Sequence, residues 1–248
     1  ASVQMTSNGG RGKTAGVFIR GTESRHTILL IDGVRYGSAT AGTPVWDNIP
    51  VDMIERIEVL KGPASALYGP DAAGGVVQIF TRRGTQGFSP FAAVTLGSNS
   101  YRELSAGLSG GQDNVRYALG VSHTDENGFS STNPTVPFGN YNPDRDAFKQ
   151  KAFNASVDWQ LNSDWKLSAG AVYADGTNHF DDGPGVDTKS DARTTVLRAG
   201  VEGRITPAWT TRLNYNQGTD RSNALVSASV FNIPGLFESQ QDQWTWQN

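Results

Sequence analysis

The chain has 248 residues, and its composition excludes several classes of protein. Charged residues make up 18%, and the net charge is −3, so the basic footprint of a nucleic-acid-binding protein is missing. Without cysteine, disulfide scaffolds, thiolate metal sites and cysteine nucleophiles are excluded. No apolar run reaches the roughly 18 residues of a membrane-spanning helix. The 29 glycines and the 10% of aromatic residues remain compatible with a transmembrane β-barrel.

The first 83 residues predict a small α+β domain. Residues 27–31 have the pattern of a buried strand, and Asp32-Gly33 after them is a turn signal. Alternating residues over 54–60 predict a second strand, and residues 76–81 a third. Between these two strands, Pro63 favours the start of a short helix over residues 64–68.

Residues 84–248 predict antiparallel strands with an apolar side chain at every second position. The clearest segments are 115–121, 153–161, 165–173, 197–205 and 209–215. Several approach the 9–11 residues of a tilted strand that crosses a bilayer. We expect lipid contacts from Phe153, Ala155, Val157, Leu161, Leu167, Ala169 and Leu213. We expect Asn154, Asp158, Lys166, Arg198, Glu202 and Arg212 to face the barrel interior.

The connections between these segments alternate between short and long. Tight turns are predicted at 110–114, 162–164 and 206–208, and long loops at 123–147, 175–193 and 218–239. An up-and-down transmembrane β-barrel has this asymmetry between its two ends. The alternative is a soluble β-sandwich, which would give the same alternation of residues without the asymmetry between short and long connections.

Sequence motifs of other protein classes are incomplete or absent. Residues 9–14, Gly-Gly-Arg-Gly-Lys-Thr, end like a phosphate-binding loop, but Ser7 stands where that motif needs glycine, and residues 17–19 predict a strand instead of a helix. The three histidines are scattered, and no Gly-x-Ser-x-Gly motif occurs. We therefore predict that the protein is not an enzyme.

Several segments, in order and spacing, resemble the plug domain of TonB-dependent outer-membrane transporters. They are Val-Phe-Ile-Arg-Gly at 17–21, Ile-Leu-Leu-Ile-Asp-Gly-Val-Arg at 28–35, Ile-Glu-Arg-Ile-Glu-Val-Leu-Lys-Gly-Pro at 54–63, and the segments 65–69 and 73–79. The motif positions are Arg20, Gly21, Asp32, Gly33, Arg56, Gly62, Pro63, Tyr68, Gly69, Gly74 and Gly75. Within the family the chain is most similar to the cobalamin (BtuB-type) transporters.

The resemblance implies a 22-strand, monomeric barrel in the bacterial outer membrane, closed by the plug and energised by the TonB complex. We expect residues 1–83 to be the C-terminal part of the plug and residues 84–248 the first barrel strands. An eight-strand barrel is filled by its own side chains and cannot enclose a plug, so we expect further strands after Asn248 and a TonB-contacting segment before the plug.

The expected function is energised uptake of a scarce ligand, with cobalamin first. A ferric siderophore or haem is the alternative within the family, and a passive porin or adhesin the alternative from another class. We expect the ligand to contact plug loops formed by Thr22, Glu23, Ser24, Arg25, His26, Tyr36, Ser38, Thr40 and Trp46. Residues 36–42 depart from the cobalamin pattern.

No covalent cofactor is expected, but calcium is. Asp144 and Asp146 lie in the first long loop, and Asp175 and Asp181 in the next. These loops are neighbours at one end of a meander, and Ca²⁺ takes six to eight oxygens at about 2.3–2.6 Å. The resemblance implies that calcium orders these loops, with Ser130 at the position of a further aspartate. A solvated acidic loop is the alternative.

Overall fold

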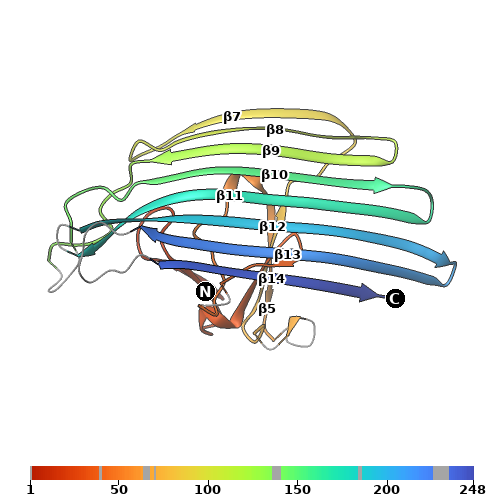
Figure 1. The fold of residues 1–248 in the computed structure, drawn as a ribbon, viewed down its shortest axis with the longest axis horizontal. Coiled ribbons are helices and arrows are strands. Elements are labelled where there is room, and N and C mark those ends of the chain that lie inside the picture. Colours follow the sequence, from red (N-terminus) through yellow and green to blue (C-terminus); the bar gives the residue numbers. More distant parts are fainter. Residues whose placement is uncertain are drawn as a thin grey trace.

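The computed structural model describes residues 2–38, 41–63, 68–69, 71–135, 141–183, 186–225 and 235–248. These residues form a two-stranded, a four-stranded and an eight-stranded β-sheet (Figure 1). No helix among the described residues is long and apolar enough to cross a membrane.

The two smaller sheets make up an N-terminal domain, strands β1 to β6. Strands β1 (Val3–Ser7) and β2 (Ala15–Ile19) pair antiparallel. The four-stranded sheet has the order β4-β3-β6-β5, and β3 pairs parallel with β6. Its strands are β3 (Thr27–Ile31), β4 (Val34–Arg35), β5 (Ile54–Lys61) and β6 (Gly75–Thr81), with single 3-10 turns η1 (Ser24–His26) before β3 and η2 (Val51–Met53) before β5. The three predicted strands are confirmed, whereas the predicted helix over 64–68 lies outside the described residues apart from Tyr68.

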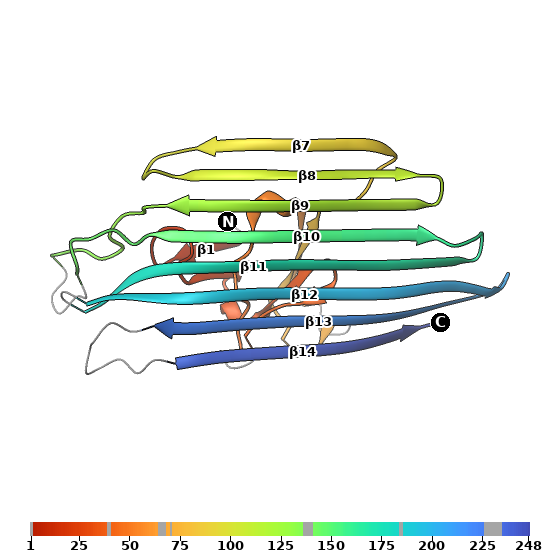
Figure 2. The same ribbon diagram turned by 45° about the horizontal axis from the view of Figure 1, so that its top comes forward.

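The eight-stranded sheet is an antiparallel meander in which each strand pairs with its neighbours in sequence (Figure 2). The strands are β7 (Gly87–Leu96), β8 (Arg102–Gln112), β9 (Val115–Glu126), β10 (Phe148–Gln160), β11 (Trp165–Gly183), β12 (Val186–Thr206), β13 (Trp209–Leu225) and β14 (Gly235–Gln247). The three predicted tight turns are confirmed, and they lie at the end of the sheet where the chain also ends (Figure 1). Among the described strands, β7 and β14 do not pair with each other, so the sheet is an open arc.

Two of the predicted long loops are mostly strand. Strands β11 and β12 stay paired as far as Gly183 and Val186, and β12 pairs with β13 as far as Leu225. The prediction was wrong here because polar residues continue the backbone ladder after the apolar alternation ends. Apolar residues alternate only in the part of a strand whose two faces have different surroundings, one apolar and one polar. Backbone hydrogen bonding between two strands does not need this pattern.

The two faces of the sheet differ as the alternation predicted. Phe153, Val157, Leu161, Leu167 and Leu213 are 36–41% exposed. Between them on β10, Asn154 and Ser156 are buried. The outer face is therefore apolar and the inner face polar, which suits lipid on one side.

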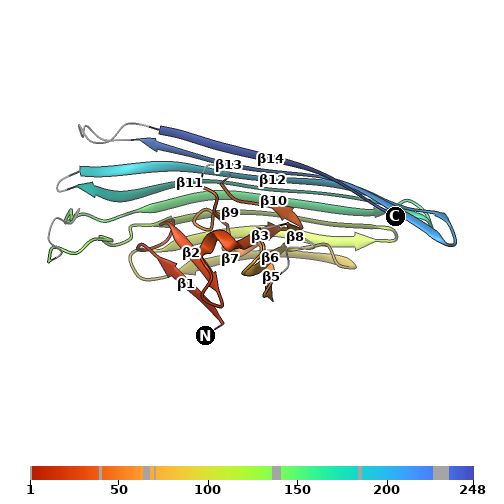
Figure 3. The same cartoon turned by 90° about the horizontal axis from the view of Figure 1, so that it is seen from below.

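The N-terminal domain packs on the inner, concave face of the arc (Figure 3). Its core is continuous with a patch of the wall: Ile19, Leu29 and Ile31 cluster with Val17, Val34, Tyr36, Met53, Val77, Ile79, and with Ala152, Val172, Ala174 and Val196 of the sheet. The contact between the domain and the wall therefore includes an apolar patch in addition to polar side chains. Small wall residues such as Ala152 and Ala174 allow the close approach that burial of this patch requires.

Candidate functional site

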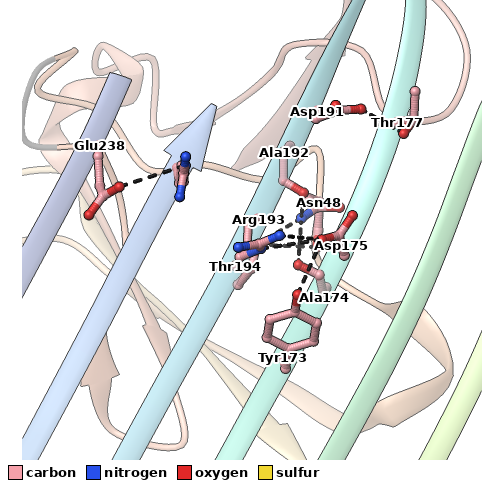
Figure 4. A network of polar contacts seen from close by, with 11 residues as sticks. Asn48, Tyr173, Ala174, Asp175, Thr177, Asp191, Ala192, Arg193, Thr194 and Glu238 are labelled. Atoms are coloured by element: carbon pink, nitrogen blue, oxygen red, sulfur yellow. Dashed lines mark hydrogen bonds and ion pairs between the residues drawn. The ribbon is translucent and has the colours of Figure 1, made fainter. Parts of the chain in front are cut away.

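Asn48 is the centre of a polar network between the N-terminal domain and the wall (Figure 4). Its side-chain amide donates to the carbonyl oxygen of Ala192 at 3.0 Å, to Thr194 Oγ1 at 3.1 Å and to the carbonyl of Ala174 at 3.4 Å. Gln150 Nε2 donates to Asn48 Oδ1 at 2.8 Å. One buried amide thus joins three barrel strands to the N-terminal domain.

Tyr36 is a second polar anchor. It is 2% exposed, and its hydroxyl lies 2.8 Å from Thr194 Oγ1 and donates to Asp220 Oδ1 at 3.3 Å. Burial, followed by the nearby Asp220 carboxylate, raises the pKa of Tyr36 well above its usual value. The phenol is therefore a neutral hydrogen-bond donor to the wall. Tyr36 was expected to contact ligand at an exposed plug loop, and its hydroxyl is instead buried against the barrel.

Asp32 forms an ionic contact at the same interface. Its carboxylate accepts hydrogen bonds from the Thr81 amide at 3.0 Å and hydroxyl at 2.6 Å, and lies 3.8 Å from both Arg83 and Arg198. Arg198 is thus an interior charge that reaches the N-terminal domain. The other expected interior charges pair along the wall: Asp158 with Lys166 at 3.2 Å, and Glu202 with Arg212 at 2.5 Å.

Several cavities lie between the N-terminal domain and the wall. One, of about 740 Å³, is lined by residues including Asp32, Arg83 and Arg198. Another, of about 280 Å³, is lined by Arg25, Tyr36 and Ser38 among others. The structure therefore brings three of the predicted ligand residues to one pocket.

The remaining predicted ligand residues are placed differently. Thr22, Glu23, Ser24 and His26 follow the C-terminal end of β2, opposite the end that is joined to the turn in contact with Ser131 and Phe148. Thr22 and His26 pack beside Gly74, whose amide donates to the His26 carbonyl at 2.8 Å, and Glu23 pairs with Arg25. Ser24 begins η1, Trp46 is partly buried, and Thr40 lies outside the described residues.

Three of the four predicted calcium residues converge at the long-connection end of the sheet. Carboxylate oxygens of Asp144, Asp146 and Asp181, the external acidic cluster, lie within 4.8 Å of one another. Asp146 Oδ2 accepts from the Ser131 amide at 2.7 Å. Asp181 Oδ2 accepts from the Thr132 hydroxyl and, at 3.4 Å, from the hydroxyl of Ser130.

The other oxygen of each carboxylate has no such partner. Oδ1 of Asp144, Asp146 and Asp181 is buried without a hydrogen-bond partner among the described residues. Burial raises the pKa of Asp144, and so do the carboxylates of Asp181 and Asp187. Three buried oxygens left unpaired beside one another fit a hard divalent cation, which takes ligands of this type.

Asp175 is not part of this cluster. Its carboxylate accepts from Arg193 at 2.9 Å and from the Tyr173 hydroxyl at 3.1 Å, on the outer face of β11 (Figure 4). Asp175 follows Tyr173 by two residues, so the alternation of a strand puts both side chains on one face. The prediction treated this segment as a loop, in which that constraint does not apply.

Lys13 was not among the residues predicted for this site. Lys13 is 5% exposed, and its ammonium donates to Asn178 Oδ1 at 2.5 Å, to the His179 carbonyl and to the Asp146 carbonyl at 3.5 Å. It lies in the segment 9–14 that failed as a phosphate-binding loop. A cationic residue in a glycine-rich turn was the available signal, but its partners are more than 130 residues away in sequence.

An α+β domain seated on the polar face of an up-and-down sheet, whose other face is apolar, defines a plugged outer-membrane barrel. Residues 1–76 match the TonB-dependent receptor plug domain, and residues 58–243 match the TonB-dependent receptor-like β-barrel. The chain belongs to the TonB-dependent receptors, a family of the bacterial outer membrane.

Curated relatives include vitamin B12 transporters. The BtuB protein of Photobacterium profundum is 31% identical over 253 residues, covering 99% of this chain and 39% of that protein. BtuB of Vibrio cholerae is 36% identical over 153 residues, or 55% of this chain and 25% of that protein. The chain therefore spans about two fifths, or less, of the length of these relatives.

Solved structures of siderophore receptors share the fold. The ferric enterobactin receptor PfeA of Pseudomonas aeruginosa, in complex with BCV-L6, aligns with a TM-score of 0.71 at 20% identity, covering 99% of this chain and 42% of that chain. The pyoverdine receptor FpvA of the same species aligns with a TM-score of 0.71 at 17% identity, covering 91% and 34%. At these identities the likeness concerns the fold alone.

Proposed function

We propose that this chain is part of a receptor that takes up a scarce ligand across the outer membrane with energy from TonB, a role in transport rather than catalysis. The observation that carries this proposal is the plug on the inner face of the sheet. A passive pore has no need of a folded domain held in its lumen by the Asn48, Tyr36 and Asp32 contacts. Such polar contacts can be exchanged for water when the plug moves, at a net cost of about 1 kcal/mol each.

Cobalamin is the ligand we propose. The support is the 31% identity to a vitamin B12 transporter over 99% of this chain, whereas the siderophore receptors are similar in fold at 20% identity or less.

The test uses the full-length receptor. Uptake of radiolabelled cyanocobalamin should occur in cells that make the receptor and a functional TonB, and should be lost without TonB. Purified receptor should bind cyanocobalamin in preference to ferric enterobactin. Uptake that continues without TonB would indicate a passive pore, and preference for ferric enterobactin would move the receptor to the siderophore class.

We propose further that the external acidic cluster binds Ca²⁺. Asp144, Asp146 and Asp181 would hold the ion, which would cancel the repulsion between their buried oxygens and fix the two segments that carry them.

Calcium titration calorimetry on the full-length receptor tests this site. Replacing Asp146 or Asp181 by Asn should weaken binding strongly, and Asp175→Asn is the matched control because that carboxylate is paired with Arg193. Equal calcium affinity in all three variants would contradict the site.

A further inference from the structure

The turn that joins β1 and β2, residues 8–14, fits closely against Ser131 in a long connection and Phe148 at the start of β10. A Cβ on Gly12 (φ +74°) would collide with the Phe148 ring, and one on Gly9 would collide with Ser131. Glycine is required at these positions because the barrel side chains occupy the space of a side chain. We call residues 8–14 the tip turn.

Lys13 of the tip turn connects the two segments that carry the external acidic cluster. One acceptor of its ammonium, the Asp146 carbonyl, belongs to a residue of the cluster. The other two, Asn178 Oδ1 and the His179 carbonyl, belong to residues three and two positions before Asp181 on β11. An ammonium has three donors, so these three oxygens use all of them.

The charges of this region also match. Lys13 binds a backbone carbonyl of Asp146, which leaves the Asp146 carboxylate free to face Asp144 and Asp181. The three cluster carboxylates and the Lys13 ammonium have a formal charge of −2, and the nearby Asp187 carboxylate adds to this negative charge, which favours a divalent cation. Arg11, in the same turn, is engaged elsewhere: it lies 3.5 Å from Glu126 and 4.7 Å from the Tyr101 ring centre.

We propose that Lys13 is a positioning residue through which the plug holds both carboxylate segments in their cation-binding arrangement. This inference rests on the proposed calcium site. Because the coupling between two linked equilibria is reciprocal, a cation in the cluster stabilises the seated tip turn, and withdrawal of the turn weakens cation binding by the same factor. Movement of the plug would then change the cation affinity of the external acidic cluster.

The experiment measures calcium affinity of the full-length receptor by calorimetry, without organic ligand, in wild type, Lys13→Met and Arg11→Met. Loss of a residue that orients metal ligands costs about tenfold or more in metal affinity, so Lys13→Met should bind calcium at least that much more weakly. Arg11→Met removes the same charge from the same turn and should not weaken binding. Tighter binding by both variants would mean that Lys13 acts as a competing charge, which overturns the proposal.

Hydrogen exchange of the tip-turn amides in the wild-type receptor gives a second measurement that needs no variant. Calcium should slow their exchange, and Asp146→Asn should abolish this effect. If wild type binds calcium but neither the exchange nor the Lys13→Met affinity responds, the positioning role is wrong and the calcium site stands. If wild type binds no calcium, both fail, while TonB-dependent cobalamin uptake remains a separate question.

Discussion

Replacing Asn48 by Ala should loosen the plug within the barrel. The substitution removes the donors to the Ala192 carbonyl and Thr194 and the acceptor for Gln150, three contacts of 2.8–3.1 Å at a residue that is 3% exposed. At a net 0.5–1.5 kcal/mol each, these bonds contribute about 2–4 kcal/mol to seating of the plug. Gln150 Nε2 also donates to the backbone carbonyl of residue 48 at 3.1 Å, and the substitution leaves this hydrogen bond in place. The loss of seating free energy should therefore be smaller than the sum for three fully lost hydrogen bonds.

Hydrogen exchange of the β3 amides in the full-length receptor measures this cost, because these amides exchange when the plug opens. A loss of 2–4 kcal/mol should speed their exchange by about 30- to 1,000-fold. Asn48→Asp should be worse than Ala, because a carboxylate would face the carbonyls of Ala174 and Ala192. Asn127→Ala, at an exposed position, is the control. Exchange in Asn48→Ala that equals the control would refute the reasoning and assign the seating of the plug to the apolar patch.

Three further predictions concern the plug and the barrel wall. Gly75→Ala should destabilise the plug by at least about 2 kcal/mol in the same exchange measurement, because Gly75 has φ +152° and a Cβ would collide with the Leu60 carbonyl; unchanged exchange would contradict this. Val157→Lys, on the outer face, should cost about 2–4 kcal/mol in folding titrations into lipid, and Gln243→Lys, on the interior cavity, much less; equal costs would argue against the assigned faces. Burial raises the pKa of Asp47, so this carboxyl favours the fold below its unfolded pKa and loses that contribution as pH rises through its folded pKa. Asp47→Asn should therefore raise the unfolding temperature at about pH 7 but not at about pH 3, and a gain at both values would refute the assignment.

Local pattern was sufficient for the strands, the tight turns and the two faces of the sheet. Alternation over 153–161 and 165–173 follows directly from one apolar and one polar surrounding, and burial in the structure follows it at 153–157 and 165–168. Local pattern was insufficient where both faces of a strand have the same polar surroundings. The outer halves of β11 and β12 therefore looked like loop, although their backbones are paired.

The candidate site was predicted in part for the same reason. Asp144, Asp146 and Asp181 could be brought together from topology alone, because adjacent loops of a meander share one end of the sheet. Asp175 could not be excluded in this way, since its orientation depends on the strand continuing past Tyr173. Tyr36 was expected at a ligand surface, and its burial against Thr194 depends on how closely the plug approaches the wall.

Local patterns were enough to identify the class of the protein, because the plug segments, the period-two strands and the short and long connections each depend on residues close together in the sequence. Which plug residues contact which wall residues became visible only in the folded protein. Asn48 with Thr194, Asp32 with Arg198 and Lys13 with Asn178 are contacts between residues more than 140 positions apart. Their partners are fixed by the angle and depth at which one folded domain sits against another, and no local pattern encodes that placement.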